Sequence, residues 1–184
     1  MGRAVTRLAD SHRDFIARQQ MFFVATAPLS GDGHVNLSPK GLDGTFAVID
    51  DATVAYLDLV GSGIETVAHL RENGRICLMF CAFEGEPNIL RLHGRGEAIF
   101  PGDADYDALR KHFGDLPGER SVVRVRVDRV EDTCGYGVPL YDYAGQRAQL
   151  TDWSAKQGPQ NLGVYQRTRN AHSIDGLPGV LVEA

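Results

Sequence analysis

The sequence predicts a mainly β fold with added helices, built around a small antiparallel barrel. Short segments in which apolar and polar residues alternate with period two recur along the chain. Turn residues separate these segments, and only a few helical patterns interrupt them. A parallel sheet would need a crossover between successive strands, so this order favours an antiparallel barrel. We expect one domain over residues 1–184, because this length is sufficient for a single core.

The first third of the chain predicts one helix and two hairpins. An amphipathic helix is expected over residues 6–20, with Leu8, Phe15 and Ile16 on its apolar side. Turn-forming Gly, Asp and Ser residues then mark the ends of four strands. These strands are 22–28 and 34–39, joined by the turn 29–33, and 45–49 and 53–59, joined by Asp50 and Asp51.

The segment after the second hairpin predicts a helix that begins after Ser62. Ser62 and Glu65 have the spacing of a capping box, in which the serine hydroxyl caps the helix and the glutamate reaches back to the Ser62 amide. The helix is expected to end at Asn73 and Gly74, since glycine commonly follows the last helical turn.

The remaining chain predicts two strands, a helix, a third strand and a helical extension. Gly94 and Gly96 lie inside the second of these strands and indicate a bulge or a sharp bend of a closing barrel. The expected elements are strands 75–83 and 89–100, helix 103–113, strand 121–130, an irregular loop over 134–143, and helical pieces 150–156 and 161–169. We assign the core of the domain to about residues 15–130, and a C-terminal loop and helical extension to about 131–184.

Composition and charge argue against several classes of protein. A net charge of −5 with scattered basic residues gives no footprint for nucleic acid. No apolar run approaches the length of a membrane span, and the N-terminal residues lack an apolar signal core. The cysteines Cys77, Cys81 and Cys134 contain no CxxC pair, which favours a cytoplasmic location with free, buried thiols. The histidines show no metal-ligand spacing, so no metal site is expected.

A candidate phosphate site lies between residues 35 and 66. Val35, Leu37 and Pro39 alternate with Asn36, Ser38 and Lys40, which predicts a half-buried strand whose second face carries an amide, a hydroxyl and an ammonium group. The loop Gly61-Ser62-Gly63 follows strand 53–59 and opens the predicted helix. A polar strand face beside a glycine-rich helix start is a typical place for a phosphate group.

Several of these segments together resemble the pyridoxamine 5′-phosphate oxidase-related, FMN-binding split-barrel family. They are VNLSPKG, AYLDL, GSGIETVAHLRENGRICLMF and ILRLHGRGEAI, and the resemblance covers roughly residues 15 to 130. It implies an antiparallel FMN-binding split β-barrel and a homodimer with two FMN sites at the subunit interface, to each of which both subunits contribute. It also marks cofactor-binding positions along two strands, the helix start and a strand near the dimer seam. These positions are Asn36, Ser38, Lys40, Tyr56, Leu57, Asp58, Ser62, Gly63, Glu65, Thr66, Arg91 and His93.

Two departures from the family pattern concern the phosphate and the substrate. Glu65 and Thr66 stand where the oxidase has a pair of basic residues, so the phosphate would rest on backbone N–H groups, Ser62, Thr66 and Lys40. The C-terminal Arg- and Trp-containing substrate motif of the oxidase is absent, and the loop CGYGVPLYDY with the later SIDGLPG resembles a separate branch of the family. The resemblance therefore implies the fold without implying pyridoxamine phosphate as substrate.

The resulting hypothesis is an FMN-dependent oxidoreductase that transfers a hydride to or from a small molecule. The alternatives are a deazaflavin-dependent reductase on the same barrel, and a flavin- or haem-binding dimer without turnover. No catalytic acid or base is assigned. Asp58 either accepts a hydrogen bond from the pyrimidine edge of the flavin or simply ends its strand. Trp153 is either an aromatic lid over the flavin of the partner subunit or an anchor in the core or the interface. His69 is expected on the solvated side of its helix, and Cys134 is expected to be buried.

Overall fold

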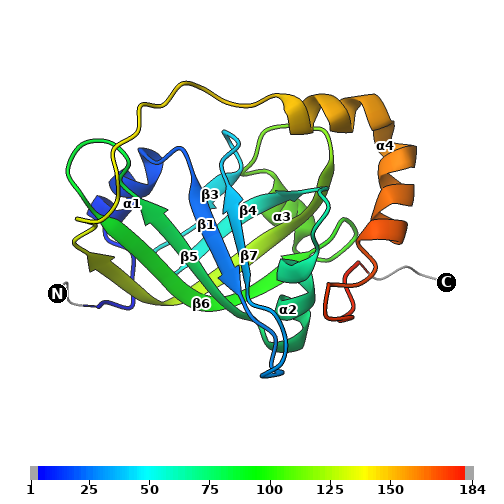
Figure 1. Ribbon diagram of the computed structural model, residues 1–184, viewed down its shortest axis with the longest axis horizontal. Coiled ribbons are helices and arrows are strands. Elements are labelled where there is room, and N and C mark those ends of the chain that lie inside the picture. Colours follow the sequence, from blue (N-terminus) through cyan, green and yellow to red (C-terminus); the bar gives the residue numbers. More distant parts are fainter. Residues whose placement is uncertain (1–3, 181–184) are drawn as a thin grey trace.

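Seven antiparallel strands form one curled sheet in the order β2-β1-β5-β6-β7-β4-β3 (Figure 1). The computed structural model describes residues 4–180, so both ends of the predicted domain, 1–3 and 181–184, lie outside the described residues. The strands are β1 (Phe22–Thr26), β2 (Asn36–Lys40), β3 (Phe46–Val48), β4 (Thr53–Leu59), β5 (Arg75–Cys81), β6 (Ile89–Ile99) and β7 (Glu119–Thr133). The helices are α1 (Asp10–Ala17), α2 (Glu65–Asn73), α3 (Tyr106–Arg110) and α4 (Gln149–Arg169).

The sheet curls into a barrel that is split between its two end strands, β2 and β3. This confirms the predicted antiparallel split barrel, including the hairpins β1–β2 and β3–β4. The prediction for the strand over residues 53–59 matches β4 at both ends. Helices α1 and α3 are shorter than predicted, and turns replace their outer residues.

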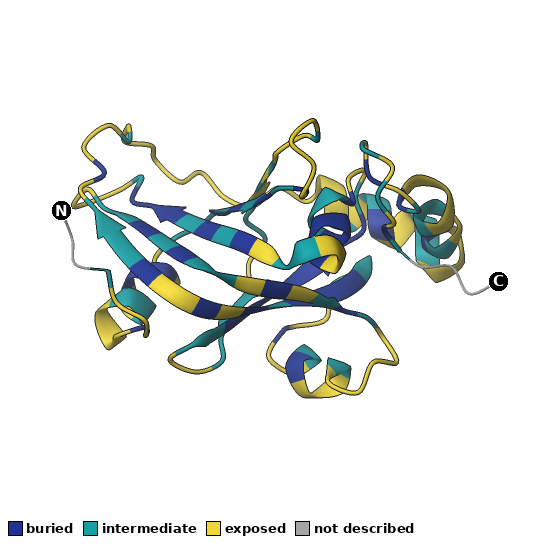
Figure 2. Cartoon of the chain, turned by 90° about the horizontal axis from the view of Figure 1, so that it is seen from below, coloured by how far each residue is buried: buried dark blue, intermediate teal, exposed yellow. Residues whose placement is uncertain are grey.

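The barrel encloses one apolar core, and a second core lies behind β4 and β7. The first contains Val24, Leu78 and Leu92, all with no exposed surface, and Phe22 packs edge-on against Phe46 across the split. The second core lies beneath α3 and includes Leu57, Ile99, Leu109 and Phe113. Figure 2 shows buried and more exposed residues alternating along several strands, as expected where the sheet buries one face, whereas β4 is covered on both faces and is buried along nearly its whole length.

Strand β2 reverses the expected burial of its two faces. Val35 and Leu37 are 74% and 62% exposed, whereas the polar residues Asn36, Ser38 and Lys40 are half-buried and face the split. The alternation itself was predicted correctly. The inside of the barrel at this end is polar because β2 borders the split, where it meets α2 and β4.

The C-terminal part of the chain leaves the barrel and returns to it. From β7, residues 134–148 run across one side of the barrel without regular structure and reach α4 (Figure 1). Helix α4 consists of two helical pieces, as predicted, because Gly158 breaks the helical dihedral angles just before Pro159. In the described part of the chain, no helix is both long and apolar enough to cross a membrane.

The bend of β6 depends on Gly94. The pairing of β6 with β7 shifts register between His93 and Gly94, which confirms the predicted irregularity. A Cβ atom at Gly94 would clash with the backbone carbonyl of Arg126 on β7. Strand backbone on both sides fixes this close approach, so the bend admits no side chain.

We therefore expect Gly94→Ala to lower the free energy of unfolding by about 1–3 kcal/mol, because the added methyl group forces two paired strands apart. Urea unfolding followed by circular dichroism measures this change. Gly114→Ala is the matched control, since a Cβ atom there meets open space. Equal losses of unfolding free energy in both variants would show that the close approach of the backbone at Gly94 is not the cause of the destabilisation.

Candidate functional site

The polar face of β2 forms a hydrogen-bonded cluster with the first turn of α2. The Asn36 side-chain amide donates to the Thr66 and Thr26 hydroxyls at 3.0 and 3.1 Å, and the Ser38 hydroxyl donates to Asn36 Oδ1 at 2.9 Å. The Thr26 hydroxyl also bonds His69 Nδ1 at 2.9 Å. Three of the predicted residues, Asn36, Ser38 and Thr66, therefore meet at one end of the split.

His69 is fully buried, so the prediction that it lies on the solvated side of its helix is wrong. Helix α2 packs against β1, β5 and β6, and this turns His69 toward Thr26 on β1. Burial lowers the pKa of His69, while the nearby carboxylates of Asp175, Glu65 and Glu72 act in the opposite direction. The buried imidazole is therefore uncharged at neutral pH.

Three buried polar side-chain atoms have no hydrogen-bond partner among the described residues: Tyr56 Oη, His69 Nε2 and, on α4, Ser154 Oγ. Burial, with a contribution from the Asp58 carboxylate, raises the pKa of Tyr56, so its hydroxyl stays protonated. A buried polar atom without a protein partner is a place where a water molecule or a ligand atom binds.

A charged network lies next to the amide cluster. Lys40 Nζ is 3.5 Å from Asp58 Oδ1, and Arg120 Nε donates to Asp58 Oδ2 at 2.7 Å. Arg120 also donates to the Gly63 carbonyl and to Asn170 Oδ1 at 3.0 and 2.9 Å. Asp58, Arg120 and Asn170 are buried, whereas the Lys40 side chain is 27% exposed. Lys40 is thus the positive group of this network that reaches solvent.

Asp58 is ionised although it is buried. Burial would raise the pKa of this carboxyl group, but the Arg120 guanidinium and the Lys40 ammonium beside it hold the pKa below its ordinary value. Since both Asp58 oxygens are engaged by Lys40 and Arg120, the structure makes Asp58 part of an ion network rather than the end of its strand.

Helix α2 begins at Glu65, so the prediction that Ser62 caps it is wrong. The N-cap residue is Ile64, which makes no side-chain cap, and Ser62 is exposed. The Glu65 carboxylate instead accepts from the Ile64 N–H at 2.9 Å and from the Ile174 N–H at 3.3 Å. A carboxylate therefore already occupies the positive end of the helix dipole, where an anion would otherwise bind.

Arg91 and His93 lie on another face of the sheet. Both are on β6, which β5 and β1 separate from β2. Arg91 donates to the Thr133 hydroxyl at 3.0 Å, and His93 Nε2 is 4.0 Å from Cys77 Sγ. The structure thus places these two residues away from the cluster around Lys40.

The structure also shows the surroundings of the three cysteines and of Trp153. Cys81 is buried and Cys77 half-buried, but Cys134 is exposed, which corrects the expectation of a buried thiol. Cys134 lies where β7 ends and the chain enters its irregular segment, so no neighbouring strand covers it. Trp153 packs edge-on against Tyr165 of the same helix at 5.2 Å.

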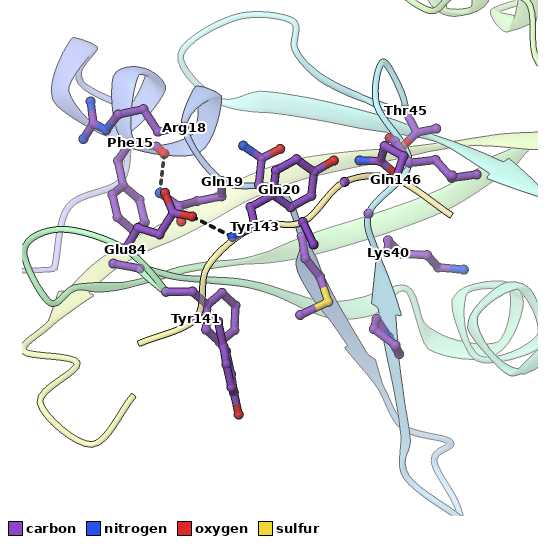
Figure 3. A pocket seen from close by; sticks show the side chains of 18 of the residues that line it. Phe15, Arg18, Gln19, Gln20, Lys40, Thr45, Glu84, Tyr141, Tyr143 and Gln146 are labelled. Atoms are coloured by element: carbon purple, nitrogen blue, oxygen red, sulfur yellow. Dashed lines mark hydrogen bonds between the residues drawn. The ribbon is translucent and has the colours of Figure 1, made fainter. Parts of the chain in front are cut away.

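A cavity of about 1240 Å³ opens beside Lys40 (Figure 3). Its wall includes Lys40, Leu57, Gly61 and residues of α1. Residues 141–147, here called the strap, border it as they pass from the end of β7 toward α4. Aromatic rings and side-chain amides contribute much of the lining: Phe15, Gln19, Gln20, Phe83, Tyr141, Tyr143 and Gln146.

The strap is held to the barrel by few bonds. The Tyr141 N–H donates to the Phe83 carbonyl at 2.9 Å, and the Tyr143 N–H donates to the Glu84 carboxylate at 3.1 Å. The rings of Phe83 and Tyr141 are 5.6 Å apart. The cavity volume exceeds the roughly 300–1,000 Å³ of a typical small-molecule pocket, so the cavity has room for a large ligand.

Sequence reasoning missed Arg120 and Asn170. Arg120 directly precedes the predicted strand 121–130, and Asn170 follows the last predicted helix. Neither position carries a local motif, because their partners Asp58 and Gly61 are distant in the sequence.

We expect Asp58→Asn to destabilise the fold by about 3–5 kcal/mol at neutral pH, because it leaves the buried Arg120 charge without its partner. The folded-state pKa of Asp58 is lowered, so its contribution is complete above the unfolded-state value of about 3.9 and is lost as pH falls through the folded value. Denaturant unfolding between pH 7 and pH 3 should show the difference between wild type and variant shrinking below about pH 4. Asp14→Asn, at an exposed position of α1, is the control. A difference that does not depend on pH would contradict this account.

Comparison with known proteins identifies the family. The family model described as pyridoxamine 5′-phosphate oxidase matches residues 8–134. The protein ustO of Aspergillus flavus, described as a pyridoxamine 5′-phosphate oxidase family protein, is 40% identical over 191 residues, which cover 94% of this chain and 76% of ustO.

Solved structures share the fold at low sequence identity. HupZ of Group A Streptococcus is 23% identical with a TM-score of 0.54, covering 73% of this chain and 99% of the HupZ chain. A Clostridium acetobutylicum protein related to general stress protein 26 of B. subtilis (pyridoxinephosphate oxidase family) is 13% identical with a TM-score of 0.50, covering 68% of this chain and 87% of its own. With the match of the family model and the identity to ustO, the chain belongs to the pyridoxamine 5′-phosphate oxidase family.

Proposed function

We propose that this protein is a flavin-binding oxidoreductase that uses FMN to transfer a hydride to or from a small molecule. The observation that carries the proposal is the cavity of about 1240 Å³ (Figure 3), whose lining combines Lys40, Leu57 and several aromatic side chains. Membership of the pyridoxamine 5′-phosphate oxidase family supports a phosphorylated planar cofactor in this position.

The ring end of the cavity fits a flavin. Flavin rings are planar and largely apolar, with polar atoms along one edge, and sites for such ligands combine apolar walls with a few polar groups. Leu57 and Leu59 of β4 supply apolar wall here, while Tyr141 and Tyr143 supply aromatic surface from the strap. The amide side chain of Gln20, which lies near Tyr143 in Figure 3, supplies donors and an acceptor.

The phosphate end fits FMN through Lys40 rather than through the start of α2. Lys40 borders the cavity and is partly exposed, and the Gly61 backbone lies on the same side. The Glu65 carboxylate accepts from the N–H of Ile64, the residue before α2, and its negative charge disfavours a phosphate there. We therefore assign the phosphate to Lys40 and the Gly61 side of the loop, and not to Ser62 and Thr66.

When bound, FMN supplies the hydride chemistry, and the chain binds and orients it. Asp58 holds Lys40 in place, and Arg120 keeps Asp58 ionised, so the Lys40 ammonium remains a fixed positive charge at the cavity edge. The strap covers part of the cavity and limits the access of water. Asp58 itself has both oxygens engaged and is therefore unsuited to act as a general base.

The proposed active form is a homodimer joined through the outer face of the sheet. Two rows of facing residues cross β2, β1, β5 and β6: Leu37, Ala25, Cys77 and His93 in one, and Pro39, Phe23, Met79 and Arg91 in the other. Leu37 is 62% exposed, while Phe23, Met79 and Cys77 are only partly buried. An apolar sheet face of this kind is typical of a protein–protein interface. A second copy of the chain on this face would also bring Arg91 and His93 to the subunit contact.

We expect Lys40→Met to raise the FMN dissociation constant about 10–100-fold, since it removes one charged hydrogen bond worth about 1.5–3 kcal/mol. Fluorescence titration with FMN and with riboflavin separates the two ends of the cofactor. Riboflavin, which lacks the phosphate, should bind wild type and variant equally. Lys111→Ala at the end of α3 is the control for loss of a positive charge.

An equal loss of riboflavin affinity in Lys40→Met would place Lys40 at the ring instead of the phosphate. A wild-type protein that binds neither FMN nor riboflavin would overturn the proposed cofactor, and deazaflavin and haem would be titrated next. A protein that binds FMN but whose flavin no nicotinamide nucleotide or amine reduces would be a flavin-binding dimer without turnover.

Leu37→Asp should convert the dimer to a monomer, because it replaces the exposed leucine of the apolar face with a charge. Size-exclusion chromatography with light scattering measures the mass of each form. Leu29→Asp is the matched control, since Leu29 is 65% exposed in the loop between β1 and β2. A wild-type protein that is monomeric, or a Leu37→Asp variant that stays dimeric, would rule out this face as the interface.

A further inference from the structure

The C-terminal extension contacts the loop between β4 and α2 from several directions. This loop, residues 60–64, contains Gly61 at the edge of the cavity and the residues that lead into α2. The extension consists of α4 and the turn that follows it, residues 171–180, which we call the clasp. In Figure 1 the clasp lies next to α2. In the sequence it is more than 100 residues after the strands that carry Lys40 and Asp58.

Asn170, at the end of α4, makes the central contact. Its side chain has no exposed surface, accepts from Arg120 at 2.9 Å and donates to the Gly61 carbonyl at 3.0 Å. Arg120 in turn bonds the Gly63 carbonyl and the Asp58 carboxylate. One amide side chain thus joins the backbone at the cavity edge to the ion network that holds Lys40.

The clasp also covers the start of α2. A Cβ atom at Gly179 would lie 2.6 Å from Ile64 Cγ1, so the clasp backbone packs directly on the residue that precedes the helix. The Ile174 N–H donates to Glu65 Oε1 at 3.3 Å. Asp175 accepts from the His34 backbone N–H and bonds His34 Nδ1 at 2.8 and 2.7 Å. The clasp therefore links the entry to β2 with the entry to α2.

Helix α4 supports the same loop from its first half. The Gly118 carbonyl accepts from the Val60 N–H at 2.7 Å, and this bond fixes the beginning of the loop. A Cβ atom at Gly118 would lie 2.5 Å from Ser154 Oγ, so α4 packs against the backbone of residue 118. The C-terminal extension therefore contacts Gly61 and Ile64 of this loop directly. It contacts Val60 indirectly, through Gly118.

We propose that Asn170 is a positioning residue for the phosphate group of the cofactor. It fixes the Gly61 backbone at the edge of the cavity that Lys40 also lines, and it acts through Arg120 and Asp58 on the position of the Lys40 ammonium. The phosphate end of the site is therefore assembled from two parts of the chain. The hairpins and the loop after β4 provide the Lys40 ammonium and the Gly61 backbone, and the C-terminal extension fixes their positions. This inference rests on the proposed function, because it assigns the held group to a phosphate monoester such as that of FMN.

The test is Asn170→Ala, with Asn161→Ala as matched control, because Asn161 is exposed on α4 and donates only to the Gln157 carbonyl. Titration with FMN and riboflavin should show FMN bound about tenfold more weakly by Asn170→Ala and riboflavin bound as in wild type, a loss comparable to one hydrogen bond. Hydrogen exchange followed by mass spectrometry should show faster exchange of the amides of residues 60–66 in this variant, with or without cofactor. The control should match wild type in both measurements.

Gly179→Ala is the second variant, in case Asn170→Ala does not fold. Its added methyl group would meet the backbone oxygen of Asn170 and the Ile64 side chain, so it pushes the clasp away from both while the Asn170 side chain is kept. It should also speed exchange at residues 60–66 and weaken FMN selectively. Unchanged exchange in this loop, or equal weakening of FMN and riboflavin, would overturn the inference. A wild-type protein that binds no FMN overturns the proposed function, whereas variants that bind FMN as tightly as wild type overturn the role of Asn170 alone.

Discussion

The ion pair between Asp58 and Arg120, with 2.7 Å between Oδ2 and Nε, is the interaction on which the rest of the site depends. Both residues are buried and lie on the neighbouring strands β4 and β7, so neither charge can be satisfied by water. Lys40, Asn170 and the Gly63 carbonyl complete the bonding of this pair. The pair thus bonds to β2 at the split, to the loop before α2 and to the C-terminal extension. The positions of these three regions therefore depend on the same ion pair.

The split of the barrel places polar groups where a closed barrel would have a paired strand. Strand β2 pairs only with β1, and β3 pairs only with β4, so side chains bridge the remaining gap. Phe22, which pairs with Lys40 across β1 and β2, contacts Phe46 over this gap, and Lys40 beside it approaches Asp58. The gap between β2 and β3 therefore has an apolar part and a charged part. This arrangement suits a ligand with one apolar and one anionic end.

The sequence was sufficient for the elements and the family, but not for the orientation of several side chains. Period-two patterns and turn residues located the strands, and Gly74, in the left-handed conformation, ended α2 as predicted. Alternation along β2 separates two faces but cannot say which one is buried, since that depends on α2 and β4. His69 was misplaced for the same reason: its burial follows from the packing of α2 on β1. Arg120 and Asn170 act through partners more than 45 residues away, and local patterns carry no information about such contacts.

The strap has a consequence for how long a ligand stays in the cavity. It is attached next to the cavity by a backbone bond to Phe83 and a bond to the Glu84 carboxylate, and Gln146 adds a third attachment at Asp43. Exposed hydrogen bonds of this kind open locally far more often than the barrel unfolds. Escape of a ligand is therefore limited by the opening frequency of the strap as well as by the strength of its contacts. If FMN occupies the cavity as proposed, its release would depend on the same opening of the strap that admits a smaller molecule.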